Sequence, residues 1–157
     1  MKIFITGNPG CGKTSLIKKL IKNKNVSGFY TEEIRNKIRK GFKIIDIKTK
    51  EKGILASINI KEGPKVSKYR VNLKDLERIG IKALERKSDL IIIDEIGKME
   101  LCSEKFENKL KEVLKSNKNI LATLGKNYIK EYKKYGEIIW LTKENWNETL
   151  EKLKKMI

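Results

Sequence analysis

One stretch near the start of the chain has the residue types and the spacing of a phosphate-binding loop. Residues 7–14 match the pattern G-x-x-x-x-G-K-[ST] at every fixed position. In such a loop, successive backbone N–H groups surround phosphate oxygens. The ammonium group of Lys13 would lie on the β- and γ-phosphates, and the Thr14 hydroxyl would ligate Mg²⁺. The pattern predicts that a nucleotide's phosphate chain is bound by Gly7, Asn8, Pro9, Gly10, Cys11, Gly12, Lys13 and Thr14.

A pair of carboxylates supplies the second half of the predicted site. Asp94 and Glu95 follow the apolar residues 91–93, which read as a buried strand. Ligands of open α/β sheets gather at the carboxyl ends of strands. Asp94 is therefore predicted to hold Mg²⁺ opposite Thr14, and Glu95 to orient and deprotonate an attacking water. A solvated strand end is the alternative for the pair taken alone, and the phosphate-binding loop disfavours it.

The elements around these residues predict the architecture that brings them together. Residues 2–6 read as a buried strand, and a helix is expected over residues 13–22. Further core strands are expected at 89–94, 119–123 and 137–141. Helices are expected after Asn72, after Ser103, near residues 128–132, and after Thr142, which is predicted to cap the last one. Core strands that alternate with helices predict a parallel, doubly wound sheet.

Residues 27–71 interrupt this alternation. Strands are expected through residues 29–31, 41–47, 54–58 and 69–71, with a polar turn at 48–53 and no helix between them. Strands joined without a helix pair antiparallel. The segment is therefore predicted to be an antiparallel β insertion at one side of the sheet, within a single domain that spans residues 1–157.

Composition limits the binding partners and the cellular location that are expected of the protein. The chain has 157 residues and a net charge of +17, with lysines scattered through nearly every segment. This pattern favours a lysine-rich solvated surface over a nucleic-acid-binding face. No apolar run of 18 residues or more is present, so no membrane association is expected. The N-terminus reads as a core strand rather than a signal peptide, and two cysteines suggest free thiols, so a cytoplasmic location is expected. A monomer is expected, although no sequence feature determines the oligomeric state.

Longer motifs now resemble a known family. Residues 92–101, IIDEIGKMEL, resemble the signature of the cancer-related nucleoside-triphosphatases, also called thermophile nucleotide phosphatases. Residues 28–35, GFYTEEIR, resemble a second signature, and residues 41–43 with 53–56 resemble the hairpin that follows it. The resemblance covers essentially the whole chain. One departure is Ser67, where a glycine is more usual, and no role is assigned to the adjacent Lys68.

The resemblance implies both a fold and an activity. The fold would be a RecA-like P-loop domain of α/β class, with a mainly parallel, doubly wound sheet and an antiparallel insertion. The activity would be Mg²⁺-dependent hydrolysis of nucleoside triphosphates (ATP, GTP, CTP and UTP) to diphosphate and phosphate, slow and with broad base specificity. Besides the glycine loop, nucleotide binding would involve Ile92, Ile93, Asp94, Glu95, Ile96, Gly97, Lys98 and Met99.

Several polar side chains admit two interpretations. Arg35 is predicted to be catalytic with Glu95 and Lys13, reaching over the γ-phosphate as an arginine finger. The alternative for Arg35 is a surface ion pair with an adjacent glutamate. Lys98 would reach a phosphate or lie on a solvated loop. Thr123 would contact the attacking water or be a buried, satisfied hydroxyl.

The aromatic residues are expected to pack rather than to bind. Phe29 and Tyr30 could stack on a base, but on a strand they are expected to pack against neighbours. Trp140 and Trp146 lie on apolar faces of their elements and are expected in the core.

Two rival functions are also compatible with the sequence. A small-molecule or nucleotide kinase would hydrolyse nucleotide only by leakage to water, and its acceptor pocket would have to lie in the 27–71 insertion. An RNA-associated NTPase or a nucleotide-operated switch would respond to RNA or to a protein activator. No N-K-x-D motif or other base-specific motif is present, and the sequence does not identify the physiological substrate.

Overall fold

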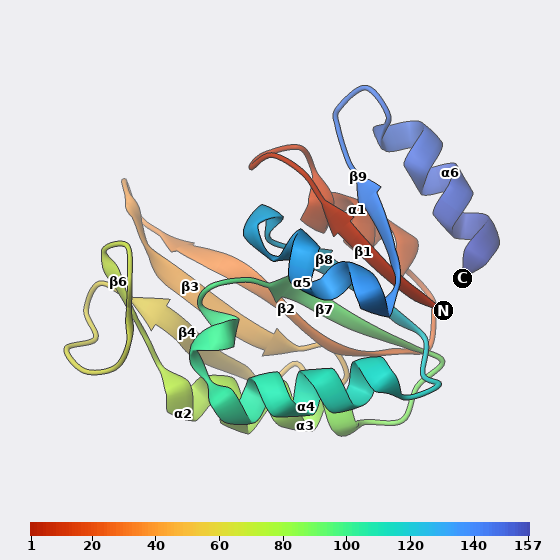
Figure 1. Cartoon of the computed structure of the whole chain (residues 1–157). Helices are drawn as coiled ribbons and strands as arrows, with labels where there is room; N and C mark the ends of the chain where they lie inside the picture. Colours follow the sequence, from red (N-terminus) through yellow and green to blue (C-terminus); the bar gives the residue numbers. More distant parts are fainter.

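A single sheet of nine strands runs through the protein. The computed structural model describes residues 1–157. Its strands are β1 (Lys2–Thr6), β2 (Val26–Arg35), β3 (Arg39–Asp46), β4 (Lys52–Ser57), β5 (Lys65–Val66), β6 (Tyr69–Val71), β7 (Leu90–Ile96), β8 (Ile120–Leu124) and β9 (Glu137–Trp140). Their order across the sheet is β5-β6-β4-β3-β2-β7-β8-β1-β9 (Figure 1).

Helices cover both faces of this sheet, as Figure 1 shows. The α-helices are α1 (Lys13–Leu20), α2 (Leu73–Asp75), α3 (Lys82–Glu85), α4 (Glu104–Lys115), α5 (Ile129–Tyr132) and α6 (Trp146–Met156). A π-helical stretch, η1 (Leu76–Ile81), joins α2 to α3, and the 3₁₀ turns are η2 (Glu100–Cys102), η3 (Lys126–Tyr128) and η4 (Lys133–Tyr135). Helices α1 and α6 pack on one face, and α2 to α5 pack on the other.

Strand residues alternate between the two resulting cores. Phe4 and Ile93 face the core under α3 and α4, whereas Ile5 and Ile92 face the core under α1 and α6. Strand pairs β1/β8, β1/β9, β7/β8 and β2/β7 are parallel. Crossover helices between parallel strands bury both sheet faces, which explains the continuous apolar runs in the sequence. The predicted fold class, a mainly parallel α/β sheet of P-loop type, is confirmed.

Strand β2 belongs to both parts of the sheet, which corrects one sequence expectation. Its first half, from Val26 to Phe29, pairs parallel with β7, where Phe29 lies opposite Ile93. Its second half, from Phe29 to Arg35, pairs antiparallel with β3. The antiparallel insertion therefore grows out of a strand of the parallel sheet, because one ten-residue strand is long enough to have different neighbours along its length.

The hairpin β5–β6 at the far edge was not predicted, because β5 has only two residues. Ser67 lies in its turn with a φ of 56°, in the left-handed region that glycine adopts most easily. The backbone conformation accounts for the glycine that is more usual at this position.

Two helix starts agree with the sequence patterns. The Asn72 side chain accepts a hydrogen bond from the Asp75 N–H at 3.1 Å, and Ser103 Oγ accepts one from the Phe106 N–H at 3.1 Å. Both are N-cap interactions that satisfy otherwise unpaired donors. The Asp75 carboxylate does not complete a capping box, because it accepts from the N–H of Ile54 on β4.

The start of the last helix was predicted wrongly. Thr142 does not cap α6, because its Oγ1 accepts from the Asn145 N–H at 3.1 Å within a separate turn. Asn145 Oδ1 in turn accepts from the Thr142 N–H at 2.8 Å. Helix α6 begins only at Trp146, so a local side chain–backbone turn has replaced the first predicted helical turn.

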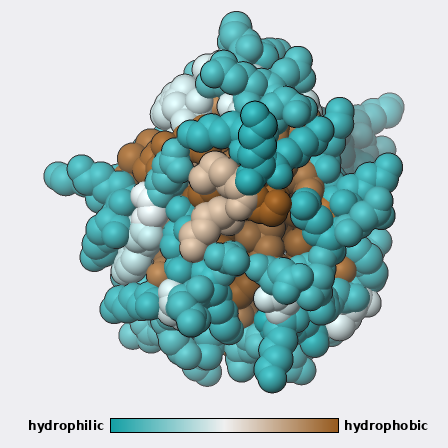
Figure 2. All heavy atoms as spheres, turned by 90° about the vertical axis from the view of Figure 1, so that its right-hand side faces the viewer, coloured by the Kyte–Doolittle hydropathy of each residue, from teal (hydrophilic) through white to brown (hydrophobic).

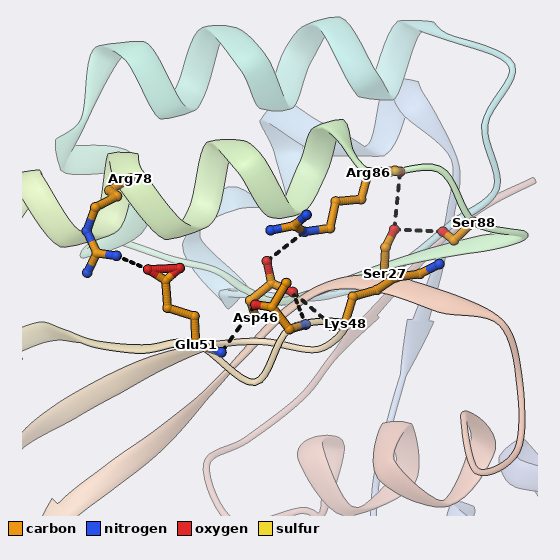
Figure 3. A network of polar contacts seen from close by, with 8 residues as sticks. Ser27, Asp46, Lys48, Glu51, Arg78, Arg86 and Ser88 are labelled. Carbon is orange, nitrogen blue, oxygen red and sulfur yellow. Dashed lines mark hydrogen bonds and ion pairs between the residues drawn. The ribbon is translucent and has the colours of Figure 1, made fainter.

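A buried carboxylate ties the insertion to the helical face of the sheet (Figure 3). Asp46, at the end of β3, is 1% exposed. It accepts hydrogen bonds from Arg86 Nε at 2.9 Å and from the N–H groups of Lys48 and Thr49 at 2.9 and 3.1 Å. A buried charge is tolerated when it is paired and hydrogen-bonded. The Asp46–Arg86 pair therefore fixes the position of β3 against the end of α3.

Removing the Asp46 carboxylate is expected to destabilise the fold without touching the active site. In Asp46→Ala, the Arg86 guanidinium and two N–H groups lose their acceptor, at a cost of about 3 kcal/mol. Urea unfolding would measure this loss, with Asp89→Ala, an exposed aspartate, as the control. Equal unfolding midpoints for the two variants would contradict this account of the network.

Figure 2 shows the side of the molecule at which both termini lie. Hydrophilic residues cover most of this face around a smaller apolar area, in keeping with lysines spread through the sequence. No helix has the combination of length and apolar character needed to cross a membrane.

Candidate active site

The glycine loop connects β1 to α1 at the carboxyl edge of the sheet, as predicted. Gly12 has a φ of 95°, and its carbonyl accepts a hydrogen bond from Trp146 Nε1 of α6 at 3.0 Å. A Cβ at this position would lie 2.8 Å from the same indole nitrogen. The glycine is thus required both by the backbone conformation and by the closeness of Trp146. Trp146 is half-buried and supports the loop, a role that its sequence position did not reveal.

Lys13 lies inside the loop. Its Nζ donates to the carbonyl oxygens of Gly7 and Asn8 at 3.1 and 3.2 Å. Lys126, from η3, donates to Asn8 Oδ1 at 3.1 Å and brings a second positive charge to the outside of the loop. Cys11 is buried, with 7% exposure. A concentration of positive charge and N–H groups at a helix N-terminus attracts phosphate.

The structure brings Thr14 and Asp94 together from α1 and β7. Thr14 Oγ1 donates to Asp94 Oδ2 at 2.9 Å, and Thr123 Oγ1, from β8, donates to Asp94 Oδ1 at 2.7 Å. Thr123 is therefore a buried, satisfied hydroxyl, one of its two interpretations. Burial raises the pKa of Asp94, although the two hydroxyl hydrogen bonds and the charges of Lys18 and Lys13 act in the opposite direction.

The Thr14–Asp94 pair fits Mg²⁺ better than it fits metal ions whose ligands all come from protein side chains. No group of three or more His, Cys, Asp or Glu side chains is arranged to hold a metal. Mg²⁺ keeps several waters and is bound through one or two carboxylates together with substrate phosphates. One hydroxyl and one carboxylate oxygen 2.9 Å apart, next to a phosphate-binding loop, supply that partial set.

Glu95 follows Asp94 through a cis peptide bond and is more accessible than Asp94. Burial raises the pKa of Glu95, and the neighbouring Asp94 raises it further, while Lys13 lowers it. The charge of Lys13, which lies in the phosphate-binding loop, is therefore near enough to Glu95 to act on its carboxyl. A carboxylate with a raised pKa and access to solvent suits proton transfer near neutral pH.

A third carboxyl, Glu100, was not singled out from the sequence. It lies in η2 and is 3% exposed. Burial raises its pKa from 4.5 to about 8, and repulsion from Glu95 adds to this effect. The signal that could have found it is a glutamate within the apolar end of the IIDEIGKMEL stretch, between Met99 and Leu101.

Glu100 should make folding stability fall as pH rises. Below about pH 4.5, both the folded and the unfolded chain carry its proton. Between that pH and about 8, the unfolded chain releases the proton while the folded chain retains it, so the free energy of unfolding decreases.

Glu100→Gln removes this pH-dependent loss of stability. The free energy of unfolding of the variant, relative to that of the wild type, should therefore rise by about 3 kcal/mol from pH 5 to pH 7.5. Urea unfolding of both proteins at the two pH values measures the gain. A stability difference that does not change with pH would show that Glu100 is ionised in the fold.

Arg35 is not brought to the carboxylates. It lies at the end of β2, beyond the part paired with β7, and its exposed side chain forms an ion pair with Glu33 at 3.5 Å. The structure thus has the surface ion pair that was the alternative to an arginine finger, and the catalytic role of Arg35 stays a prediction. Lys98 is also exposed, beside Glu95.

The apolar residues of the second predicted binding stretch serve mainly to place its carboxylates. Ile92, Ile93 and Ile96 are fully buried and pack into the two cores. Their role in nucleotide binding stays a prediction. Trp140 was expected in the core because it lies on the apolar face of its strand. It is instead 45% exposed, because β9 is an edge strand.

Comparison with known proteins is decisive for the family. The model of the family described as NTPase matches residues 2–154 of the chain. The chain belongs to this NTPase family. Among its relatives is the nucleoside-triphosphatase THEP1 of Thermotoga maritima, 45% identical over 98% of this chain and 93% of the relative. The same-named protein of Methanocaldococcus jannaschii is 42% identical over 98% and 95%.

Solved structures of NTPase family members have the same fold. THEP1 from Aquifex aeolicus superposes with a TM-score of 0.88 at 37% identity, covering 99% of this chain and 98% of that one. A human cancer-related nucleoside triphosphatase gives a TM-score of 0.82 at 29% identity, covering 99% and 96%. The family and the enzyme class predicted from the sequence, a nucleoside-triphosphatase, are confirmed.

Proposed function

We propose that this NTPase hydrolyses nucleoside 5′-triphosphates to diphosphate and phosphate, slowly, with Mg²⁺, and with little preference among ATP, GTP, CTP and UTP. The observation that carries the proposal is the hydrogen bond between Thr14 and Asp94, with Glu95 beside it. This contact joins the phosphate-binding loop to the carboxylates of β7. The names of the THEP1 relatives, nucleoside-triphosphatases, support the same activity.

Each residue of the site has a separate role in the proposed reaction. The loop N–H groups and Lys13 bind the phosphates and compensate the charge that develops as the bond to the γ-phosphorus breaks. Thr14 and Asp94 would hold Mg²⁺, which when bound neutralises charge on the β- and γ-phosphate oxygens. Glu95 accepts a proton from the attacking water, whose oxygen bonds to the γ-phosphorus as the nucleoside diphosphate leaves. Catalysis is thus mostly positioning and electrostatics.

Slow turnover is expected from the exposed position of Arg35. Arg35 is exposed and paired with Glu33, and unassisted P-loop hydrolysis proceeds at about 10⁻³ s⁻¹ or less. Broad specificity is supported by the groove beside the loop, of about 350 Å³, which is lined by residues 8–11 and 141–144. None of the polar side chains that line it is buried, and discrimination between bases needs desolvated polar groups that pair with one base only.

The test is phosphate release from ATP, GTP, CTP and UTP with Mg²⁺ and with EDTA. We expect release from all four nucleotides at rates within about tenfold of one another, and its loss in EDTA. A wild-type protein that binds nucleotide but releases no phosphate would contradict the proposal.

A kinase is the second candidate, favoured by one observation. A hollow of about 210 Å³ lies between the insertion and the β7–α4 connection, and Glu95 lines it with Thr31 and Lys98. A hydroxyl acceptor in this hollow would lie beside the same general base. Added acceptor would then suppress phosphate release while diphosphate formation rises, whereas a hydrolase keeps the two products equal.

A further inference from the structure

The buried carboxyl of Glu100 has no role in the chemical steps described so far, yet it lies beside the same glycine, Gly97, as the Glu95 carboxylate. We propose that Glu100 is a positioning residue: in its neutral form it donates a hydrogen bond to the Glu95 carboxylate and holds it in the orientation that receives the proton of the attacking water. This inference rests on the proposed function. It concerns how the catalytic carboxylate is held in place.

Gly97 has no side chain to keep the two carboxyls apart. A Cβ at Gly97 would lie 2.8 Å from Glu95 Oε1 and 3.1 Å from Glu100 Oε1. Both contacts are closer than a Cβ normally tolerates, so the two side chains cover the same face of one glycine with no side chain between them. Gly97 is itself buried, which keeps this contact away from bulk water.

Glu100 has no basic partner that would stabilise its charge; the N–H groups of Glu100 and Gly97 hydrogen-bond to its carboxyl and lower its pKa, but burial outweighs them. No ion pair or side-chain hydrogen bond with a lysine or an arginine includes it. An unpaired charge at 3% exposure is costly, so the carboxyl takes up a proton instead. Its pKa of about 8 keeps it neutral at pH 7. A protonated carboxyl has one O–H to donate, and a carboxylate is the strongest acceptor available to it.

The other ionisable groups around Glu100 leave Glu95 as that acceptor. Asp94 already accepts from two threonine hydroxyls. Burial raises the pKa values of Cys102 and Tyr128, so both stay neutral at pH 7. Lys98 is exposed and makes no ion pair with Glu100.

A purely structural role for Glu100 predicts something different. Glu100 would then stabilise the η2 turn, and its replacement would change folding stability and leave catalysis untouched. A positioning role predicts a loss in kcat with little change in KM, because the orientation of Glu95 affects the transition state more than it affects nucleotide binding.

The experiment compares Glu100→Met, which has similar length but no donor, with Glu100→Gln, whose amide still donates. Glu112→Met and Glu112→Gln, at a glutamate with a 70% exposed side chain, are the matched controls. Steady-state kinetics with MgATP, nucleotide affinity and thermal unfolding are measured for each. We expect Glu100→Met to lower kcat about tenfold or more with KM nearly unchanged, and Glu100→Gln to restore most of the loss.

A folded Glu100→Met protein with wild-type kcat would overturn the inference, as would equal losses in the methionine and glutamine variants. If Glu100→Met does not fold, Glu100→Leu, which also lacks a donor, takes its place, and a wild-type kcat in that variant would overturn the inference. A wild-type protein without any turnover would overturn the proposed function and the inference together. Turnover that depends on Glu95 but not on Glu100 would overturn the inference alone.

Discussion

Replacing Glu95 by glutamine is expected to lower kcat by about a thousandfold while leaving nucleotide binding intact. Glutamine has the shape of glutamate but cannot take a proton from water. Burial and then Asp94 raise the pKa of Glu95, which makes its carboxylate a stronger base than an ordinary exposed one. Steady-state phosphate release with MgATP gives the rate, and titration with a fluorescent nucleotide analogue gives the affinity.

The control for this prediction is Glu104→Gln, which changes an exposed glutamate at the start of α4. It should keep wild-type kinetics. Wild-type turnover in Glu95→Gln would contradict the assignment of Glu95 as base. A loss of nucleotide affinity as large as the loss of rate would instead show that Glu95 acts in binding.

Replacing Lys13 by methionine is expected to lower kcat/KM by about a thousandfold or more, through weaker binding as well as slower chemistry. Lys13 Nζ lies within hydrogen-bonding distance of the carbonyl oxygens of Gly7 and Asn8, inside the loop that would surround the phosphates. Methionine keeps the length of the side chain and removes its charge. The loss should be largest for ligands that carry β- and γ-phosphates.

Affinities for ATP and AMP, measured on the wild type, Lys13→Met and the exposed control Lys22→Met, separate this effect from a general loss of charge. We expect Lys13→Met to weaken ATP binding strongly and AMP binding little, and Lys22→Met to change neither. Equal losses for the two nucleotides in Lys13→Met would place the ammonium group away from the β- and γ-phosphates.

The parts of the site that the sequence could predict are those encoded by short contiguous patterns. Gly7 to Thr14 and the strand ending in Asp94 are each recognisable locally, since loop and strand patterns depend on neighbouring residues. The meeting of Thr14 with Asp94 followed from the rule that ligands gather at the carboxyl ends of parallel strands. The structure confirms this meeting through their hydrogen bond.

The parts that the sequence could not predict depend on contacts between distant segments. Trp146 donates to the Gly12 carbonyl from 134 residues away, and no periodicity in α6 distinguishes this contact from ordinary packing. Strand β2 changes its pairing from parallel to antiparallel at Phe29, although its residues show no break there. Glutamate is a residue type that usually lies at the surface, and only the fold shows that Glu100 is buried.

The most direct test of the account is a single-turnover reaction of excess enzyme with MgATP in water labelled with ¹⁸O, for the wild type and Glu95→Gln. We expect the wild type to yield phosphate that contains ¹⁸O and ADP that contains none, and the variant to retain intact ATP over the same time. Label in the ADP, or hydrolysis by the variant at the wild-type rate, would contradict attack on the γ-phosphorus by a water that Glu95 activates.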